Sequence, residues 1–266
     1  MCLSDYELLG LFGRGGQGKV YNAKRKSDGL TVVIKKVKKD IFTTLCNNIP
    51  TEIKLLEKVQ NIEGVIQMLD FIIEENFFYI VMEKIEECVD LFDFISKYGG
   101  LEEKLTKKMF HSIVKTNILC RESNIYHRDI KDENILVDLK SNNVKLIDFG
   151  HACEHNYKEE PEKMFKTFYG TDVYKPPEYI LNEKYNLDIA SVWCLGILLY
   201  DMLCGDIPFE TNKEICSGKL IFTKELKLSD EARDLIEQCL KINQEKRISL
   251  DNILSHVWFK IDEKKS

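Results

Sequence analysis

The sequence lacks the features that mark several large classes of protein. Its nine cysteines are odd in number and none are spaced as CxxC, which argues against a disulfide framework and a zinc site. The longest apolar stretch, residues 192–200, is far shorter than the roughly 20 residues of a membrane span, and Asp5 interrupts the N-terminus before an apolar signal segment forms. Cys2 stands where a myristoylation signal needs glycine. We therefore expect a soluble intracellular chain with no membrane partner.

An excess of positive charge is also missing. The chain has 38 Lys and Arg residues against 44 Asp and Glu residues, a formal net charge of -6 at pH 7. Proteins that bind nucleic acid hold its phosphates with positive charge. We therefore expect no nucleic-acid partner and favour basic partners. There is no internal repeat, and residues 158–163 (KEEPEK) are interpreted as a solvated charged loop.

The chain has 266 residues, and 44% of them are hydrophobic. This is enough to form a sizeable hydrophobic core. Residues 6–37 alternate short apolar runs with turns and predict three antiparallel strands. A helix is expected from Pro50, followed by strands within residues 65–73 and 77–82. Later segments have helical spacing, and Ser229 is expected to cap a helix over residues 232–240. The pattern predicts an α+β protein with a small β-rich lobe before a larger α-helical lobe.

Residues 13–20 read GRGGQGKV, a GxGxxGxV pattern between two predicted strands. Glycines there let backbone N–H groups approach phosphate oxygens without a clash from Cβ. An ordinary tight hairpin is the alternative at this point of the argument. The candidate phosphate-binding residues are Gly13, Arg14, Gly15, Gly16, Gln17, Gly18, Lys19 and Val20.

Lys35 lies between apolar neighbours on the third predicted strand. A lysine that faces the cleft there can pair with the α- and β-phosphates of a nucleotide, and Glu52 on the next helix is its natural partner. The alternative is an exposed Lys–Glu pair, which would contribute only about 0–1 kcal/mol to stability.

Two further motifs are highly specific: residues 127–134 read HRDIKDEN and residues 148–150 read DFG. Together they match the protein-kinase signature. Asp129 is expected to accept or orient the proton of a substrate hydroxyl, and Lys131 to neutralise charge on the transferred γ-phosphoryl group. Asn134 and Asp148 are expected to supply oxygen ligands to Mg²⁺.

The segment from Asp148 to Glu178, which we call the activation segment, ends in PPE at residues 176–178, and Gly170 and Thr171 come shortly before it. This ending is similar to the APE motif of protein kinases. Arg247, late in the chain, is the expected buried partner of Glu178.

Over essentially its whole length the chain resembles the Pim family of serine/threonine protein kinases. The resemblance is carried by residues 87–95 (ECVDLFDFI), 127–139, 144–150 and 191–210, and by Ser191, where most kinases have an aspartate that Pim kinases also lack. It implies a bilobal kinase domain over residues 1–266, with an N-lobe to about 84, a hinge at about 84–88 and a C-lobe from about 89. It also implies ATP and Mg²⁺ as cofactors and proteins as substrates. A monomer is the default expectation, located in the cytoplasm with the nucleus as a further location.

The resemblance also assigns the nucleotide pocket. Glu83 would offer its carbonyl to adenine, and Ile85 would offer an N–H where Pim kinases have a proline that cannot donate. Gln17 replaces the usual aromatic residue at the tip of the glycine loop. The apolar residues expected around the base are Phe12, Val20, Val33, Met82 and Leu136.

Three expectations concern substrates and regulation. Acidic residues in segments that line the peptide groove of Pim kinases predict a preference for Arg or Lys upstream of the target; they are Asp90, Asp93, Asp132, Glu133, Asp201, Asp206 and Glu210. We expect Arg128 to receive an anion from phosphorylated Thr167, with the acidic insert (Glu159, Glu160 and Glu162) as the alternative. His111, His151, His155 and His256 are expected to be surface or packing residues.

The rival reading from another functional class is a catalytically weak pseudokinase that acts as a scaffold. Pseudokinases usually lose one of the residues at Lys35, Asp129 or Asp148, and all three are present here. A small-molecule kinase is disfavoured because the activation segment is full length.

Overall fold

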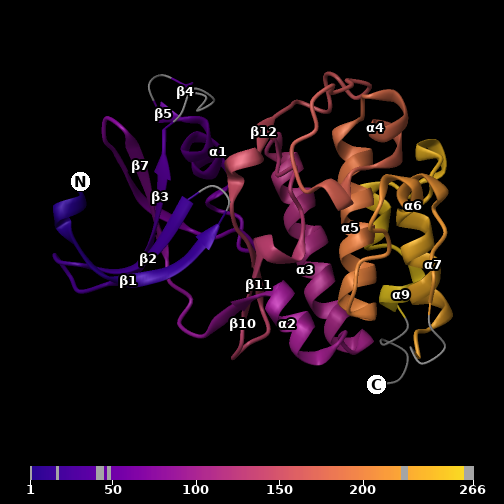
Figure 1. Ribbon diagram of the computed structural model, residues 1–266, viewed down its shortest axis with the longest axis horizontal. Helices are drawn as coiled ribbons and strands as arrows, with labels where there is room; N and C mark the ends of the chain where they lie inside the picture. The colour runs from indigo at the N-terminus through magenta and orange to yellow at the C-terminus, as the bar shows by residue number, and fades with distance from the viewer. Residues whose placement is uncertain (1, 16–17, 40–44, 47–48, 223–226, 261–266) are drawn as a thin grey trace.

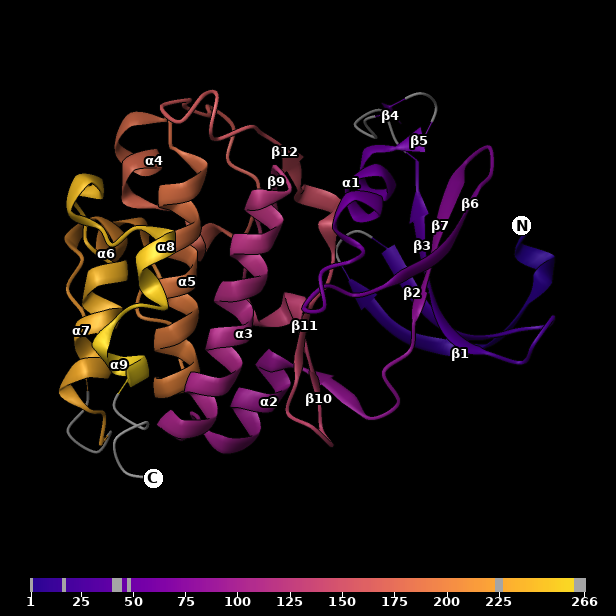
Figure 2. The same ribbon diagram turned by 180° about the vertical axis from the view of Figure 1, so that it is seen from behind.

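Two regions of different secondary structure lie side by side in the computed structural model (Figure 1), which describes residues 2–15, 18–39, 45–46, 49–222 and 227–260. A twisted sheet forms one end of the molecule and a group of helices forms the other, and the view from behind shows the same division (Figure 2). We call the described residues up to Glu83 the sheet lobe and those from Lys84 onward the helical lobe. The predicted α+β, two-lobed architecture is confirmed.

The sheet lobe contains a five-stranded antiparallel sheet in the order β1-β2-β3-β7-β6. The strands are β1 (Tyr6–Gly15), β2 (Gly18–Arg25), β3 (Thr31–Lys38), β6 (Met68–Ile73) and β7 (Phe77–Glu83). The three strands predicted for residues 6–37 are therefore confirmed. The predicted run over residues 65–73 becomes a strand only from Met68, because Val65 instead forms an isolated bridge with Leu146 of the helical lobe.

One main helix, α1 (Thr51–Val59), packs against this sheet, as Pro50 predicts. Its apolar side chains at helical spacing, among them Ile53 and Leu56, are buried in the core. The chain after α1 is tied to the helical lobe, since Ile66 donates to the carbonyl of Leu146 (3.0 Å) and Leu146 donates to the carbonyl of Gly64 (2.8 Å). The sheet lobe also contains η1 (Leu3–Asp5), β4 (Leu45–Cys46) and β5 (Ile49–Pro50).

The helical lobe is arranged around α5 (Leu187–Cys204). Asn186 caps its start by accepting from Asp188 N (3.0 Å), and Gly205 ends it with a φ of 77°. The length and apolar composition of α5 would allow it to cross a membrane, but 78% of the helix is buried inside the protein, so it is the core helix of this lobe. The other helices are α2 (Leu91–Tyr98), α3 (Glu103–Glu122), α4 (Pro177–Asn182), α6 (Asn212–Ser217), α7 (Asp230–Cys239), α8 (Leu250–Ile253) and α9 (Val257–Lys260).

The predicted cap of α7 is confirmed, because the Ser229 hydroxyl accepts from Ala232 N at 3.1 Å. The predicted partnership of Glu178 and Arg247 is confirmed as well: two N–H groups of Arg247 donate to the two carboxylate oxygens at 2.8 Å each, and both side chains are buried. This pair ties α4, at the end of the activation segment, to the chain that follows α7.

Short elements between the lobes carry the sequence motifs. Strands β8 (Cys88–Asp90), β10 (Ile135–Asp138) and β11 (Val144–Leu146) form one small sheet, and β9 (Ile125–Tyr126) pairs with β12 (Cys153–Glu154). The 3-10 turns are η2 (Asp132–Asn134), η3 (Phe149–His151), η4 (Asp172–Tyr174) and η5 (Gln244–Lys246). The HRD segment lies between β9 and β10, and the DFG segment lies between their partner strands β11 and β12, so the two motifs meet at one place.

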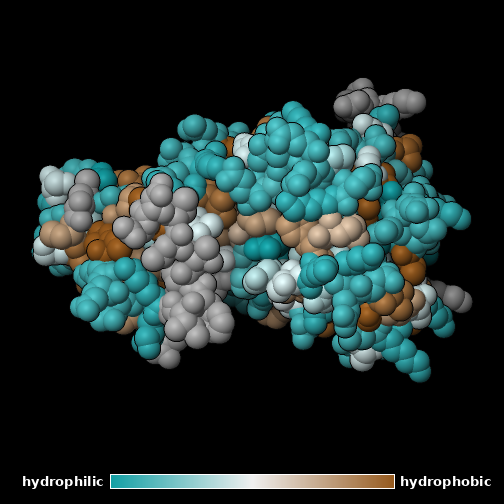
Figure 3. Space-filling view, turned by 90° about the horizontal axis from the view of Figure 1, so that it is seen from above, coloured by the Kyte–Doolittle hydropathy of each residue, from teal (hydrophilic) through white to brown (hydrophobic). Residues whose placement is uncertain are grey.

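Seen from above, the surface is mainly hydrophilic, with smaller hydrophobic areas (Figure 3). The apolar residues instead fill a core that is continuous from α1 through α3 and α5 to α9.

Candidate active site

A cavity of about 550 Å³ lies where the two lobes meet. Most of the residues that the sequence predicted for the site line this one cavity: Phe12, Gly13, Gly18, Val20, Val33, Lys35, Glu52, Met82, Glu83, Ile85, Asp129, Lys131, Asn134, Leu136 and Asp148. The motifs, spread over more than 130 positions of the chain, are thus brought together at a single site.

The glycine-rich segment is only partly described. Arg14 and Gly15 end β1 opposite Lys19 and Gly18, while Gly16 and Gln17 lie outside the described residues. The side chain of Lys19 is exposed and does not line the cavity, because neighbouring residues of a strand face opposite sides; its part in phosphate binding stays a prediction. At Gly18 a Cβ would lie 2.4 Å from the Lys36 carbonyl oxygen, so the close approach of β2 and β3 requires this glycine.

Lys35 lies at the centre of the polar end of the cavity. Its Nζ donates to Glu52 Oε1 (2.7 Å) and to Asp148 Oδ1 (2.8 Å), so one ammonium joins the sheet, α1 and the DFG segment. Burial would lower the pKa of Lys35, but the two carboxylates outweigh it and raise the pKa; the same pairing holds the pKa of Asp148 below its usual value although burial opposes it. The site therefore keeps a charged ammonium facing the space between the lobes.

Asp148 and Asn134 have oxygens that are available to a metal ion. Oδ1 of Asp148 accepts from Lys35 and from Gly150 N (3.2 Å), and the amide nitrogen of Asn134 donates to Asp129. Among the described residues, Oδ2 of Asp148 and Oδ1 of Asn134 accept no hydrogen bond, and both residues line the cavity. Mg²⁺ commonly takes one or two protein oxygens together with phosphate oxygens and water, so this pair fits that ion.

Asp129 is fixed on both carboxylate oxygens. Oδ1 accepts from Thr171 N (3.1 Å) and Thr171 Oγ1 (3.2 Å), and Oδ2 accepts from Asn134 Nδ2 (2.9 Å). Burial would raise the pKa of Asp129, but the nearby His151 ring, the charge of Lys131 and the hydrogen bond from Asn134 lower it to about 2. The carboxylate stays ionised and is oriented by the activation segment.

His151 is a site residue that the sequence reasoning missed, since it was expected to be a surface or packing residue. Its Nδ1 lies 3.7 Å from Asp129 Oδ2, and the residue lines the cavity. The available signal was its position directly after DFG. Thr171, Asp90, Phe92 and Glu133 also line the cavity without having been assigned to the nucleotide or catalytic site.

Lys131 lines the cavity but is not free, because its ammonium pairs with the carboxylate of Glu133. Burial would lower the pKa of Lys131, yet Glu133 and Asp129 raise it, so the side chain is a firmly charged cation. Its position beside Asp129 suits a cation that neutralises developing charge on a phosphoryl group.

At the other end of the cavity, the main chain that follows β7 offers polar groups to a planar base. Glu83 N donates to the Gln67 carbonyl (2.9 Å), and the Glu83 carboxylate accepts from Gln67 N (2.9 Å) and Lys145. Among the described residues, the Ile85 N–H donates to no other group. With apolar side chains on both sides, this end suits adenine.

Histidine 127 connects the two motifs. Its Nε2 lies 2.8 Å from the Ile147 carbonyl, and its ring packs edge-on against Phe149 with centroids 4.8 Å apart. Burial lowers the pKa of His127, so the ring is neutral and donates to that carbonyl.

The seven acidic residues expected in the peptide groove fall into three groups. Asp90 and Glu133 line the cavity, and Asp93, Asp206 and Glu210 are exposed. Asp132 and Asp201 are instead buried against each other, which corrects the expectation that they form part of the surface. Burial and the neighbouring carboxyl raise the pKa of Asp201 to about 7.

Arg128 has no carboxylate partner among the described residues. Its Nε donates to the His151 carbonyl (2.5 Å), and its guanidinium lies over the ring of Tyr169, 4.3 Å from the centroid. In the acidic insert, Glu160 pairs with Lys163 (2.6 Å) and approaches His155 (3.8 Å), so it does not reach Arg128. Thr167 is exposed.

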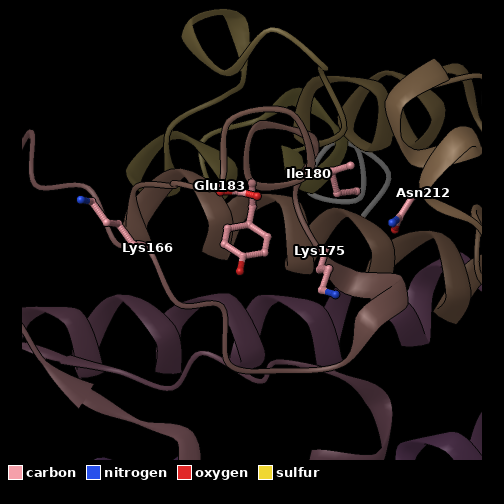
Figure 4. A pocket seen from close by; sticks show the side chains of 6 residues that line it. Lys166, Lys175, Ile180, Glu183 and Asn212 are labelled. Atoms are coloured by element: carbon pink, nitrogen blue, oxygen red, sulfur yellow. The ribbon is translucent and has the colours of Figure 1, made fainter.

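A second hollow, of about 410 Å³, lies beside the end of the activation segment (Figure 4). Its lining includes Lys166, Lys175 and Tyr179. The ammonium groups of Lys166 and Lys175 lie apart and point away from each other, so the hollow does not gather positive charge at one point (Figure 4).

Comparison of the sequence with known proteins supports this interpretation of the site. Residues 6–259 match the family described as protein kinase domain. Serine/threonine-protein kinase pim-2 of Danio rerio is 42% identical over 96% of this chain and 84% of its own length. Serine/threonine-protein kinase prk-2 of Caenorhabditis elegans is 37% identical over 96% of this chain and 58% of its own length. The CBL-interacting serine/threonine-protein kinase 12 of Arabidopsis thaliana is 29% identical over 98% of this chain and 53% of its own length. The chain belongs to the protein kinase domain family, as a Pim-like serine/threonine protein kinase that uses ATP and acts on proteins.

Proposed function

We propose that the protein transfers the γ-phosphoryl group of Mg-ATP to Ser and Thr hydroxyls that have basic residues on their upstream side. The observation that carries the catalytic part is the set of bonds from Lys35 to Glu52 and Asp148, in the same cavity as Asp129. This arrangement presents a cation for phosphates beside a fixed carboxylate for the hydroxyl.

Each site residue has a distinct part in this reaction. The Asp129 carboxylate orients the substrate hydroxyl and accepts its proton, and Lys131 balances negative charge beside it. Asn134 and Asp148 would hold Mg²⁺, which neutralises phosphate charge when bound. Lys35 positions the phosphates, and Glu52 keeps Lys35 in place.

The preference for basic residues rests on carboxylates that have no cation. Asp90, Asp93, Asp206 and Glu210 form no ion pair with a lysine or arginine that the structure describes. Burial and the negative charges of Asp93 and Glu133 raise the pKa of Asp90. A positively charged side chain on the substrate would relieve the repulsion among these groups.

Peptide kinetics test this preference. Three peptides share one target serine and carry arginines upstream, the same arginines downstream, or glutamates upstream. We expect kcat/KM for the upstream-arginine peptide to exceed that for the other two by roughly 10-fold or more. The charge reversal Asp93→Lys with Asp206→Lys should reduce this ratio, whereas Asp28→Lys, at a surface turn of the sheet lobe, serves as the control. A preference for acidic or proline-directed sites would contradict the proposal.

The scaffold alternative is tested by Asp129→Asn. The proposed kinase loses phosphate transfer to the peptide with its folding intact, whereas a scaffold would show no transfer in the wild type either. We further propose that the protein acts as a monomer, in the cytoplasm or the nucleus; its mass by light scattering and its location by microscopy are the tests.

A further inference from the structure

Arg128 has an unusual partner in the activation segment. It lies in the HRD motif, next to Asp129, and a kinase orders its activation segment when a phosphate on that segment pairs with arginine. Here the guanidinium is covered by the Tyr169 ring at 4.3 Å, and no described carboxylate lies within ion-pair distance. The face of an aromatic ring is the negative part of its charge distribution, so it attracts this cation.

The chain next to Tyr169 approaches Arg128 closely. At Gly170, where φ is 138°, a Cβ would lie 2.8 Å from the Arg128 carbonyl oxygen and 3.3 Å from the Phe168 ring. Only glycine allows the activation segment to pass this near to the HRD motif. The contact of Tyr169 is therefore part of a tight crossing of two backbones.

The next residue after that crossing reaches the catalytic base. Thr171 donates from its backbone N (3.1 Å) and from its hydroxyl (3.2 Å) to Oδ1 of Asp129. Two neighbouring residues of the HRD motif, Arg128 and Asp129, thus hold two residues of the activation segment, Tyr169 and Thr171. If the Tyr169 ring is lost, the attachment of the segment to Arg128 two residues before Thr171 is lost with it.

We propose that Tyr169 is a positioning residue that holds the activation segment on Arg128 through its ring, as a phosphate would through its charge, and so keeps Thr171 on Asp129. The contact needs no modification of the chain. This role of Tyr169 differs from the expectation that phosphorylated Thr167 supplies an anion to Arg128. That expectation stays a prediction.

The test uses full-length protein made without an upstream kinase and shown by mass spectrometry to carry no phosphate on residues 148–178. Tyr169→Ala removes the ring, and Tyr169→Phe keeps it. Tyr157→Ala is the matched control, since Tyr157 is a tyrosine of the same segment that stacks on another arginine, Arg121 (4.6 Å), away from the cavity.

We expect Tyr169→Ala to lower kcat by roughly 2- to 30-fold, the range of a cation–π contact, with little change in KM for ATP. Tyr169→Phe should stay within about 2-fold of the wild type, because the ring is retained, and Tyr157→Ala should do the same. Equal kcat for Tyr169→Ala and the wild type, or an equal loss in the Ala and Phe variants, would overturn the proposal.

Hydrogen exchange of residues 165–175 gives a readout that does not depend on activity. Exchange should become faster in Tyr169→Ala and stay unchanged in Tyr169→Phe. If the segment exchanges equally in all three proteins, the ring does not hold it and the proposal fails.

Discussion

The molecule contains two kinds of site for a positive charge, and they follow different rules. Lys35 and Arg247 are buried, and each is paired with carboxylate: Lys35 with Glu52 and Asp148, Arg247 with both oxygens of Glu178. Arg128 is only partly buried and has carbonyl oxygens and an aromatic ring instead. The difference teaches that full burial of a cation requires an opposite full charge, whereas a half-buried one is satisfied by dipoles and π electrons.

The largest effect is expected where the buried pair is broken outright. Glu178→Gln leaves Arg247 buried without an anion and should lower the free energy of unfolding by about 3–5 kcal/mol, measured by denaturant titration. The double variant Glu178→Gln with Arg247→Met removes both charges and should recover part of the loss. If the double variant is as unstable as the sum of the two single variants, the two charges do not depend on each other.

The second largest effect concerns activity. Lys35→Met should lower kcat by about 100- to 1,000-fold, because the cation for the phosphates is lost and two carboxylates are left without it. Lys36→Met is the control: it lies on the same strand, next in sequence, with its ammonium over the Phe77 ring (4.0 Å). Comparable losses in both variants would show that the effect is not specific to the cavity.

Asp201 gives the opposite case, a buried carboxyl that forms no ion pair with a lysine or arginine in the described part of the chain. Its pKa is raised to about 7, while in the unfolded chain an Asp ionises near 3.9. Between these two pH values the folded protein therefore binds one more proton than the unfolded chain. The resulting contribution to the free energy of unfolding is complete below pH 4 and is lost as the pH rises through 7.

Asp201→Asn should remove this loss of folding stability with rising pH. Between pH 5 and pH 8 the free energy of unfolding of the wild type should fall more than that of the variant, by on the order of 2 kcal/mol. Asp230→Asn, at an exposed position in the first turn of α7, should keep the slope of the wild type. Parallel pH profiles for wild type and Asp201→Asn would contradict the raised pKa.

The smallest effect is expected at the neutral end of the cavity. Ile85→Pro removes the N–H that we expect to donate to the base, and the affinity for ATP should fall by about 0.5–1.5 kcal/mol, the net value of one ordinary hydrogen bond. The Michaelis constant for ATP measures it, with the constant for the peptide as an internal control. An unchanged value for ATP would show that adenine does not use this group.

Sequence reasoning located the residues whose chemistry is tied to a motif. Asp129, Asn134 and Asp148 were found because their spacing to fixed neighbours is specific, and the cavity brings them together. The sheet order and the crossing of Gly170 over Arg128 depend on contacts between distant segments, which no local pattern records.

The differences between expectation and structure have physical causes. Lys19 was included with its glycine neighbours, but strand alternation turns it away from the cavity. Asp132 and Asp201 were counted as surface charge because acidic residues are rarely buried. His151 was assigned by residue type, and only the folded chain shows that its ring reaches Asp129.

The bonds of Gly64 and Ile66 to Leu146 have a mechanical consequence. They fasten the chain that leaves α1 to strand β11, two residues before Asp148. A rotation of the sheet that leaves these bonds intact would keep the chain after α1 beside β11 while Lys35 moves with β3. We therefore expect such an opening to lengthen the contact between Lys35 and Asp148, so that release of nucleotide would also loosen the polar centre of the cavity.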